Sequence, residues 1–156
     1  MAEAVGGTDA AVILMHRRGT AANMKELARY EDVVAQVAAE LSLAVERAHR
    51  AGIGDERLVL DPGLGFAKTA DHNWRLIGNL TPVRNARYPL MVGPSRKSFL
   101  GEATGRARAA DRDVATAVVV AELARHGVEL IRVHDVAAAN DAISVVREMT
   151  RERKPG

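Results

Sequence analysis

The sequence predicts an α/β fold with parallel strands, and three observations lead to that prediction. Short apolar runs recur along the 156 residues, and they end in polar loops, most of which contain glycine. A helical pattern follows each of these loops. The runs show no internal alternation of polar and apolar residues, which is typical of strands covered on both faces of a parallel sheet.

Four apolar runs are predicted to be strands. They are Ala11–Met15, Leu58–Leu60, Leu90–Val92 and Leu130–Val133. Each is short, in keeping with a strand that is bounded by turn residues. The alternation of these runs with helical patterns predicts four consecutive βα units.

Four helices are expected between and after the strands. The longest runs from about Met24 to His49, where apolar residues in steps of three and four mark one buried stripe, and Gly52 lies where a C-cap glycine is expected. The other three begin near residues 71, 113 and 140. Their expected core residues are Trp74, Ile77 and Leu80, then Val114, Ala117, Val118, Ala121 and Ala124, and finally Ile143, Val146 and Met149.

The number of units indicates a partial barrel. A (β/α)8 barrel of the TIM type needs eight units and about 250 residues, and this chain opens with what looks like the end of a helix at residues 2–6. We therefore expect residues 1–156 to be the C-terminal half of such a barrel, with strands five to eight and their helices. Residues 1–10 are expected to be a helix remnant and linker, and residues 151–156 a frayed tail. A compact four-stranded doubly wound domain is the alternative.

Composition excludes several classes of protein. There is no cysteine, so a disulfide framework and a thiolate metal site are excluded, which fits a cytoplasmic protein. No apolar run approaches the roughly 20 residues that span a membrane. The net charge is +2 and aromatic residues make up 3%, so neither a basic stripe nor a stacking surface for nucleic acid is expected.

The segments after the four strands are the candidate site, because the active site of a βα barrel forms at the carboxyl ends of its strands. Asp61 follows the second strand directly, and its carboxylate can accept paired hydrogen bonds from an amino-heterocycle such as an aminopyrimidinone. Asp61-Pro62-Gly63 is also strong turn chemistry, so a simple turn is the alternative. Phe66, in the same glycine-rich loop, favours a binding loop that covers a flat substrate.

Cationic residues follow the third and fourth strands. Ser95, Arg96, Lys97 and Ser98 place two cations and two hydroxyls at one exit, suited to an anion or a ring carbonyl, although a solvated basic loop is the alternative.

At the last exit, Arg132 and His134 alternate with Val133 and are expected to point to the same side, where two cations suit a diphosphate leaving group. Asp135 can orient His134 or cap the next helix, and His16 can equally be structural.

Taken together, the four exit segments resemble dihydropteroate synthase, in order, from about Val12 to Val146. The resemblance implies a transferase of folate biosynthesis that condenses 6-hydroxymethyl-7,8-dihydropterin diphosphate with p-aminobenzoate and releases pyrophosphate. It implies that diphosphate leaves toward cations and Mg²⁺ before the aniline nitrogen attacks the pterin-methyl carbon. The same resemblance implies a sulfonamide target.

The resemblance also implies roles for individual residues. Asp61, Lys97 and Met15 would bind the pterin, Phe66, Arg96 and Ser98 would bind aminobenzoate, and Arg132 and His134 would bind the diphosphate, with Lys97, Arg132 and His134 as the catalytic set. No metal ligand is expected in this chain, because the family's Mg²⁺ ligand belongs to the N-terminal half. We expect no stand-alone turnover, a homodimer in the full-length form, and no nucleic-acid or membrane partner. A non-catalytic or methyltransferase-type pterin-binding module is the alternative function.

Overall fold

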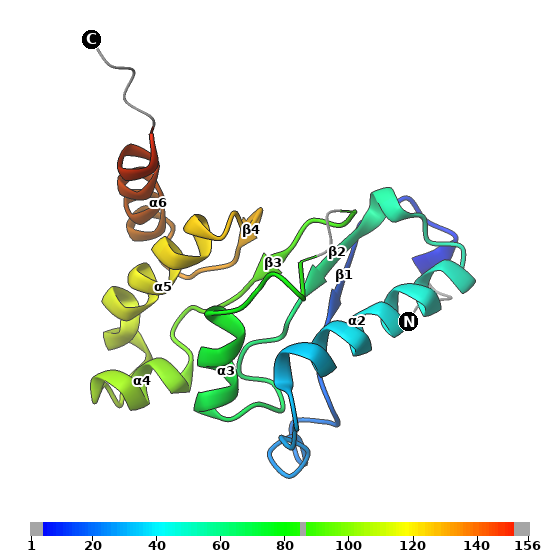
Figure 1. The fold of residues 1–156 in the computed structure, drawn as a ribbon, viewed down its shortest axis with the longest axis horizontal. Helices are drawn as coiled ribbons and strands as arrows, with labels where there is room; N and C mark the ends of the chain where they lie inside the picture. The colour runs from blue at the N-terminus through cyan, green and yellow to red at the C-terminus, as the bar shows by residue number, and fades with distance from the viewer. Residues whose placement is uncertain (1–4, 85–86, 152–156) are drawn as a thin grey trace.

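A computed structural model of the chain describes residues 5–84 and 87–151 (Figure 1). Within these residues no helix is long and apolar enough to cross a membrane. The elements, in chain order, are β1 (Val12–Met15), α2 (Val33–Arg50), the 3-10 turn η1 (Asp55–Arg57), β2 (Leu58–Asp61), α3 (Ala70–Ile77), β3 (Met91–Val92), α4 (Ser98–Thr104), the 3-10 turn η2 (Ala109–Arg112), α5 (Asp113–Arg125), β4 (Leu130–Ile131) and α6 (Val136–Thr150).

All strand pairs in the described residues are parallel, as the sequence predicted. β1 pairs with β2, and β3 pairs with β4. A single bridge between Leu60 and Leu90 joins the two pairs, so the strands follow one another in space in their chain order. Because parallel strands end at the same edge of a sheet, the four segments after the strands lie on one side of the molecule.

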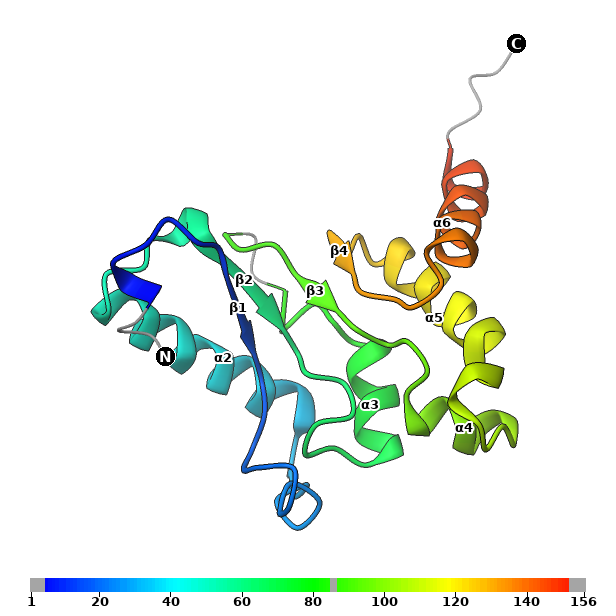
Figure 2. The same cartoon turned by 180° about the vertical axis from the view of Figure 1, so that it is seen from behind.

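The helices cover one face of the strands. α2 lies along β1 and β2, and α3 lies beside β2 and β3 (Figure 1). Seen from behind, β1, β2 and β3 lie in front of these helices with no helix over them (Figure 2). Side chains on the two outer strands are correspondingly open, with Ile13 of β1 50% and Leu130 of β4 46% exposed, whereas Leu58 and Leu60 of β2 are buried. The prediction of strands covered on both faces is therefore wrong for β1 and β4.

The predicted start of the long helix is also wrong. Residues 24–32 form turns and bends, and α2 begins at Val33. The side chain of Asp32 accepts hydrogen bonds from the backbone N–H groups of Val34 and Ala35, which caps the helix at this point. Tyr30 instead reaches the loop after β2, where its hydroxyl donates to the carbonyl of Ala67 at 3.0 Å.

The buried faces of α5 and α6 differ from those expected. On α5 the buried residues are Thr116, Val119, Val120 and Leu123, whereas Val114 is 80% and Val118 66% exposed. On α6 Val146 is buried as expected, but Met149 is 71% exposed. α5 is apolar around most of its circumference, so its sequence pattern does not identify the face that meets the core.

The remaining helices and strands begin or end within a few residues of the predicted boundaries. The expected strand Leu130–Val133 ends at Ile131, and α3 starts one residue before the expected position, with Thr69 as its cap. α6 starts at Val136, four residues before the expected start, because the Asp135 side chain accepts from the N–H of Ala138. The expected helix remnant and linker at residues 1–10 lies outside the described residues as far as residue 4. The expected tail at residues 151–156 lies outside them from residue 152.

Candidate active site

The buried carboxylate of Asp61 lies at the centre of the strand exits. Asp61 is the last residue of β2 and is 4% exposed. Its Oδ1 accepts a hydrogen bond from the N–H of Gly63 at 2.7 Å. Met15 is its register partner at the end of β1. Burial raises the pKa of Asp61, while the Gly63 N–H and then the charges of Arg132, Lys97 and Lys68 lower it.

The loop after β2 has a tightly defined backbone. Gly63, Gly65 and Ala67 all have positive φ, at 68°, 79° and 49°. The N–H of Gly65 donates to Oδ1 of the buried Asn73 on α3 at 2.8 Å. This loop therefore holds Phe66 at a fixed place beside the β3 exit, which a simple Asp-Pro-Gly turn would not require.

Lys97 connects the exits of β2 and β3. Its Nζ lies 4.3 Å from the centroid of the Phe66 ring, a cation–π contact. Its aliphatic stem passes over Gly65, where an added Cβ would come within 3.1 Å of Lys97 Cδ. Burial lowers the pKa of Lys97, Arg132 lowers it further, and Asp61 raises it. Asp61, Phe66 and Lys97 thus form one cluster.

Arg132 extends from the end of β4 toward β3. Its backbone N–H donates to the carbonyl of Val92 at 3.0 Å, and its guanidinium lies over Gly93, where an added Cβ would be 3.2 Å from Nη2. The residue is exposed, so its cationic group is open to an anion from solvent.

Ser95 ties His134 to the β3 exit. Its Oγ lies 2.8 Å from Nδ1 of His134 and accepts from the His134 backbone N–H at 3.1 Å. Ser95 is buried, whereas His134 is exposed. Of the two roles considered for Asp135, the structure shows the helix cap.

Two residues expected at the aminobenzoate site lie differently from the central cluster. The guanidinium of Arg96 forms two hydrogen bonds of 2.8 Å with the carboxylate of Asp113 at the start of α5. Ser98 is exposed and begins α4. The structure therefore places the Arg96 side chain in an ion pair that also secures the positive-φ backbone of Arg96, at 59°.

A second polar cluster lies beneath the β2 loop. It contains Lys68 from that loop, His16 and Arg18 from the β1 exit, and Glu40 from α2. Nζ of Lys68 is 2.9 Å from Nδ1 of His16, and Nε2 of His16 is 3.0 Å from Oε2 of Glu40. The other Glu40 oxygen accepts from the Arg18 guanidinium.

A comparison with known families matches this chain to one of them. Residues 1–134 match the family described as "Pterin binding enzyme". The chain belongs to this pterin-binding enzyme family. Its sequence is 45% identical over 152 residues to dihydropteroate synthase of Mycobacterium leprae, and 38% identical over 146 residues to that of Escherichia coli strain K12. These alignments cover 94% and 92% of this chain but only 54% and 51% of the relatives.

Solved structures of the pterin-binding family agree with the fold. The dihydropteroate synthase of Stenotrophomonas maltophilia superposes with a TM-score of 0.92 at 33% identity, covering 98% of this chain and 58% of that one. The Xanthomonas albilineans enzyme in complex with 7,8-dihydropteroate superposes with a TM-score of 0.88 at 34% identity, covering 97% and 56%. The chain thus spans about half the length of the relatives it matches.

For this pterin-binding chain, sequence reasoning missed the cluster of Lys68, Glu40 and Arg18. Lys68 could have been found, since it belongs to the exit segment that also contains Asp61. Glu40 carried no signal, because an acid on an amphipathic helix is usually solvated. Among the described residues, no three His, Asp or Glu side chains are grouped so that they could hold a metal ion.

Proposed function

We propose that this chain supplies four of the eight βα units of a dihydropteroate synthase barrel. Three observations support the proposal: the relatives carry that name, the chain spans about half of them, and one face of its strands is uncovered. An open strand edge and an apolar strand face require a partner surface. The remaining units of the barrel would provide it.

One observation carries the assignment of the site, namely a buried carboxylate surrounded by cations at the strand exits. Asp61 would accept two hydrogen bonds from the amino-pyrimidinone edge of a pterin, because a carboxylate is the acceptor-only group that pairs with two adjacent N–H donors. Lys97 would contact the same ring, and Met15 would pack beside it. Burial raises the pKa of Asp61, and the charges of Arg132, Lys97 and Lys68 offset part of that rise.

The second substrate would bind on the outer side of Lys97. In this proposal Phe66 and the stem of Lys97 frame the aminobenzoate ring, and Ser98 at the start of α4 faces its carboxylate. Arg96 takes part through its backbone and through its ion pair with Asp113, since Nε and Nη2 of its guanidinium already donate to that carboxylate. The same pocket would be the sulfonamide site.

The diphosphate would leave toward Arg132 and His134. Preorganised cations at a leaving oxygen stabilise the charge that develops on it. Arg132 is exposed, and within the described residues its guanidinium forms no hydrogen bond to Asp61 that would neutralise its charge. Ser95 holds Nδ1 of His134, so Nε2 is the nitrogen that would face the diphosphate.

Mg²⁺, which the resemblance implies, does not fit the described part of this chain. Of the acids at the exits, Asp61 is surrounded by cations and Asp135 caps α6, and no group of three possible metal ligands is found among the described residues. Ligands for the metal would therefore come from the other units of the barrel, and we assign no step to it here.

The test is reconstitution of activity. We expect the purified chain alone to form no dihydropteroate from dihydropterin diphosphate and p-aminobenzoate, and to do so when the N-terminal half of the Mycobacterium leprae relative is added. Asp61→Asn should abolish the restored activity, whereas Lys25→Met, a change at an exposed lysine, should not. Absence of restoration with two folded halves would count against the proposal.

The alternative function, a methyltransferase-type pterin-binding module, has no diphosphate to recognise. Calorimetry separates the two. Pyrophosphate should strengthen the binding of a pterin if Arg132 and His134 bind diphosphate. Indifference to pyrophosphate would favour the binding module.

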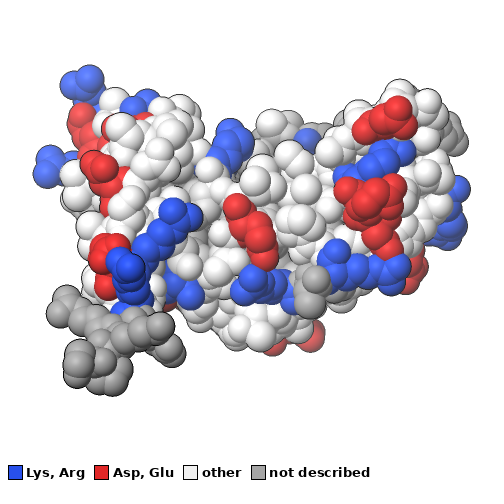
Figure 3. Space-filling model, turned by 90° about the horizontal axis from the view of Figure 1, so that it is seen from above, with Lys and Arg blue, Asp and Glu red and all other residues white. Residues whose placement is uncertain are grey.

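We also propose that the complete protein is a homodimer through the outer faces of α5 and α6. A groove of about 930 Å³ runs between these helices, and its exposed lining includes Val114, Val118, Val145 and Met149. Contiguous exposed apolar residues of this kind mark interaction surfaces. By contrast, acidic and basic side chains are interspersed over the face shown in Figure 3.

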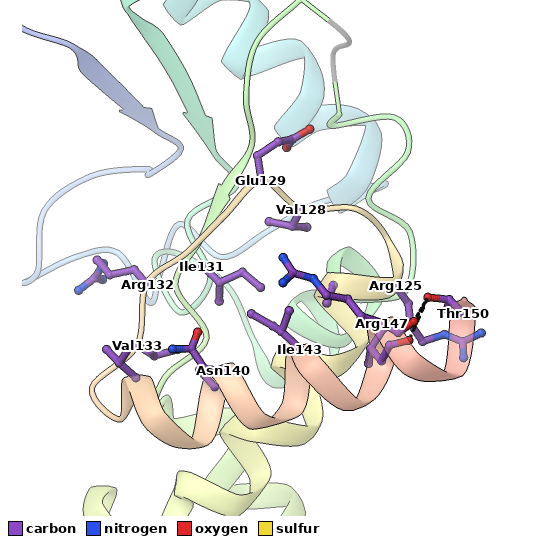
Figure 4. A pocket seen from close by; sticks show the side chains of 14 residues that line it. Arg125, Val128, Glu129, Ile131, Arg132, Val133, Asn140, Ile143, Arg147 and Thr150 are labelled. Carbon is purple, nitrogen blue, oxygen red and sulfur yellow. Dashed lines mark hydrogen bonds between the residues drawn. The ribbon is translucent and has the colours of Figure 1, made fainter. Parts of the chain in front are cut away.

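A different cavity lies at the open side of β4. It measures about 610 Å³ and is enclosed by β4, α5 and α6 (Figure 4). Ile131 and Ile143 line it together with the cationic side chains of Arg125 and Arg147, while the Arg132 side chain extends away from them toward the strand exits. In the proposed barrel this cavity borders the next strand, so we assign it to packing and not to a substrate.

A further inference from the structure

An ammonium group lies beneath the β2 loop, and none of the proposed substrate contacts uses it. Nζ of Lys68 donates to the carbonyl oxygens of Gly63 and Phe66, both at 3.1 Å, and to Nδ1 of His16 at 2.9 Å. An ammonium group has three donors and no acceptor. These three acceptors therefore engage all three N–H donors of the ammonium group. Two of the acceptors are carbonyl oxygens of the β2 loop itself.

His16 and Glu40 hold this cation in place. Because Nδ1 of His16 accepts from Lys68, the ring hydrogen is on Nε2 and is donated to Glu40 at 3.0 Å. Burial, followed by the charge of Lys68, lowers the pKa of His16 to about 4, so the ring is neutral at pH 7. Glu40 is held in turn by Arg18. The chain of contacts connects the β1 exit, α2 and the β2 loop.

We propose that Lys68 is a positioning residue for the pterin site, which holds the loop that presents Asp61 and Phe66. The inference rests on the proposed role of Asp61. Two contacts link Lys68 to that site: it holds the carbonyl of Gly63, whose N–H donates to Asp61, and the carbonyl of Phe66, whose ring faces Lys97.

The charges around both groups are consistent with this role. Asp61 is faced by Arg132, Lys97 and Lys68. Lys68 is faced by Asp61, Glu40, His16, Arg18 and Lys97, and its burial lowers its pKa to about 7. Lys68 is half-buried, all three of its donors are used, and it is fully charged only below about pH 7, so it is a specific feature of the site and not a solvated surface charge.

The first experiment needs no ligand. Lys68→Met removes the ammonium group and retains much of the stem, and Lys25→Met is the matched control at an exposed lysine. We expect amide hydrogen exchange at Gly63, Gly65 and Phe66 to become at least about tenfold faster in Lys68→Met, with no change in α5 or in the control. Unchanged exchange in the loop would overturn the positioning role.

The second experiment uses the chain reconstituted with the N-terminal half of the Mycobacterium leprae relative. It measures the affinity for 6-hydroxymethylpterin by calorimetry as a function of pH. Lys68→Met should bind about tenfold more weakly, and the pH at which binding is lost on acidification should rise by about half a unit or more, because Asp61 loses a neighbouring cation. Lys68→Arg retains the charge and should keep the wild-type midpoint, even if the affinity falls.

These outcomes separate the two proposals. An unmoved midpoint in Lys68→Met, or an affinity within twofold of the unaltered chain, would refute the role of Lys68 at the site. If the reconstituted protein with the unaltered chain binds no pterin, it is the proposed function that fails, and the exchange experiment still decides whether Lys68 anchors the loop.

Discussion

Gly63 shows how closely the exits of β1 and β2 approach each other. A Cβ atom added at Gly63 would lie 1.9 Å from the carbonyl oxygen of His16, and the backbone there has a φ of +68°. Both the space and the conformation exclude other residues. The position of Asp61, two residues earlier, depends on the turn that Gly63 makes.

We therefore expect Gly63→Ala to destabilise the chain by about 2–4 kcal/mol, from left-handed strain together with the clash against His16. Gly52→Ala is the matched control, because Gly52 has a φ of +78° but no atom within 4 Å of the added Cβ. It should cost only about 1–2 kcal/mol. Urea unfolding of both variants checks this, and equal losses would show that the clash is relieved without cost.

The buried His16 predicts a specific acid sensitivity. Its pKa is about 4 in the folded chain, against an ordinary value of 6.5. Between these values the unfolded chain binds more protons than the folded chain, so stability falls as the pH is lowered from 6.5 to 4, by about 3 kcal/mol from this group.

His16→Gln removes this effect, because an amide can accept from Lys68 and donate to Glu40 but does not titrate in this range. The free energy of unfolding of the variant should therefore change less between pH 7 and pH 4 than that of the parent chain. Denaturant titrations at several pH values provide the measurement. Parallel pH profiles for the two proteins would mean that His16 is protonated in the folded chain.

At the level of elements, a side-chain cap and not apolar periodicity sets where α2 begins. The spacing of Leu27 and Tyr30 continues the stripe of α2 toward the N-terminus, yet the helix starts at Val33. Asp32 offers the free N–H groups a better acceptor than a further turn would provide, and Tyr30 gains a hydrogen bond to the β2 loop.

Asp32→Ala should consequently lower the stability by about 1 kcal/mol, through loss of the two bonds to Val34 and Ala35. Glu31→Ala, at the adjacent exposed acid, is the control and should have little effect. Thermal unfolding followed by circular dichroism provides the comparison. A loss of equal size in both variants would indicate a general charge effect and not a cap.

At the level of the whole molecule, the chain presents two kinds of unpartnered apolar surface. The strand face carries Ile13 and Leu130, and the outer faces of α5 and α6 carry Val118 and Val145. Among the described residues, the groove is lined by residues of α3, α5 and α6 and by no strand residue, so the two surfaces can serve different partners. We assign the strand face to the rest of the barrel and the helical groove to a second copy.

Val118→Glu should therefore weaken self-association of the reconstituted protein by at least about tenfold, because it places a charge in the centre of the groove. Leu43→Glu, at an apolar residue of α2 that is 52% exposed and outside the groove, should leave association unchanged. Light scattering over a range of concentrations distinguishes these results. A dimer that persists in Val118→Glu would place the interface elsewhere.

Sequence alone predicted the βα order, the parallel strands and the four exit segments, because these depend on local patterns of apolar runs and turns. It also identified Asp61, Lys97 and Arg132, which the structure brings to one side of the molecule. It failed where both faces of an element are apolar, as on α5, since periodicity cannot distinguish two apolar faces. It also failed for Glu40, whose role depends on which charges the fold brings to it.

The sequence by itself thus determined which residues we propose to bind the pterin and that they follow parallel strands. Only the tertiary structure decided how they are held. Hydrogen bonds between segments up to 52 residues apart, such as that from Lys68 to His16, cannot be predicted from any local pattern in the sequence. Their geometry exists only after the core has brought β1, α2 and the β2 loop together.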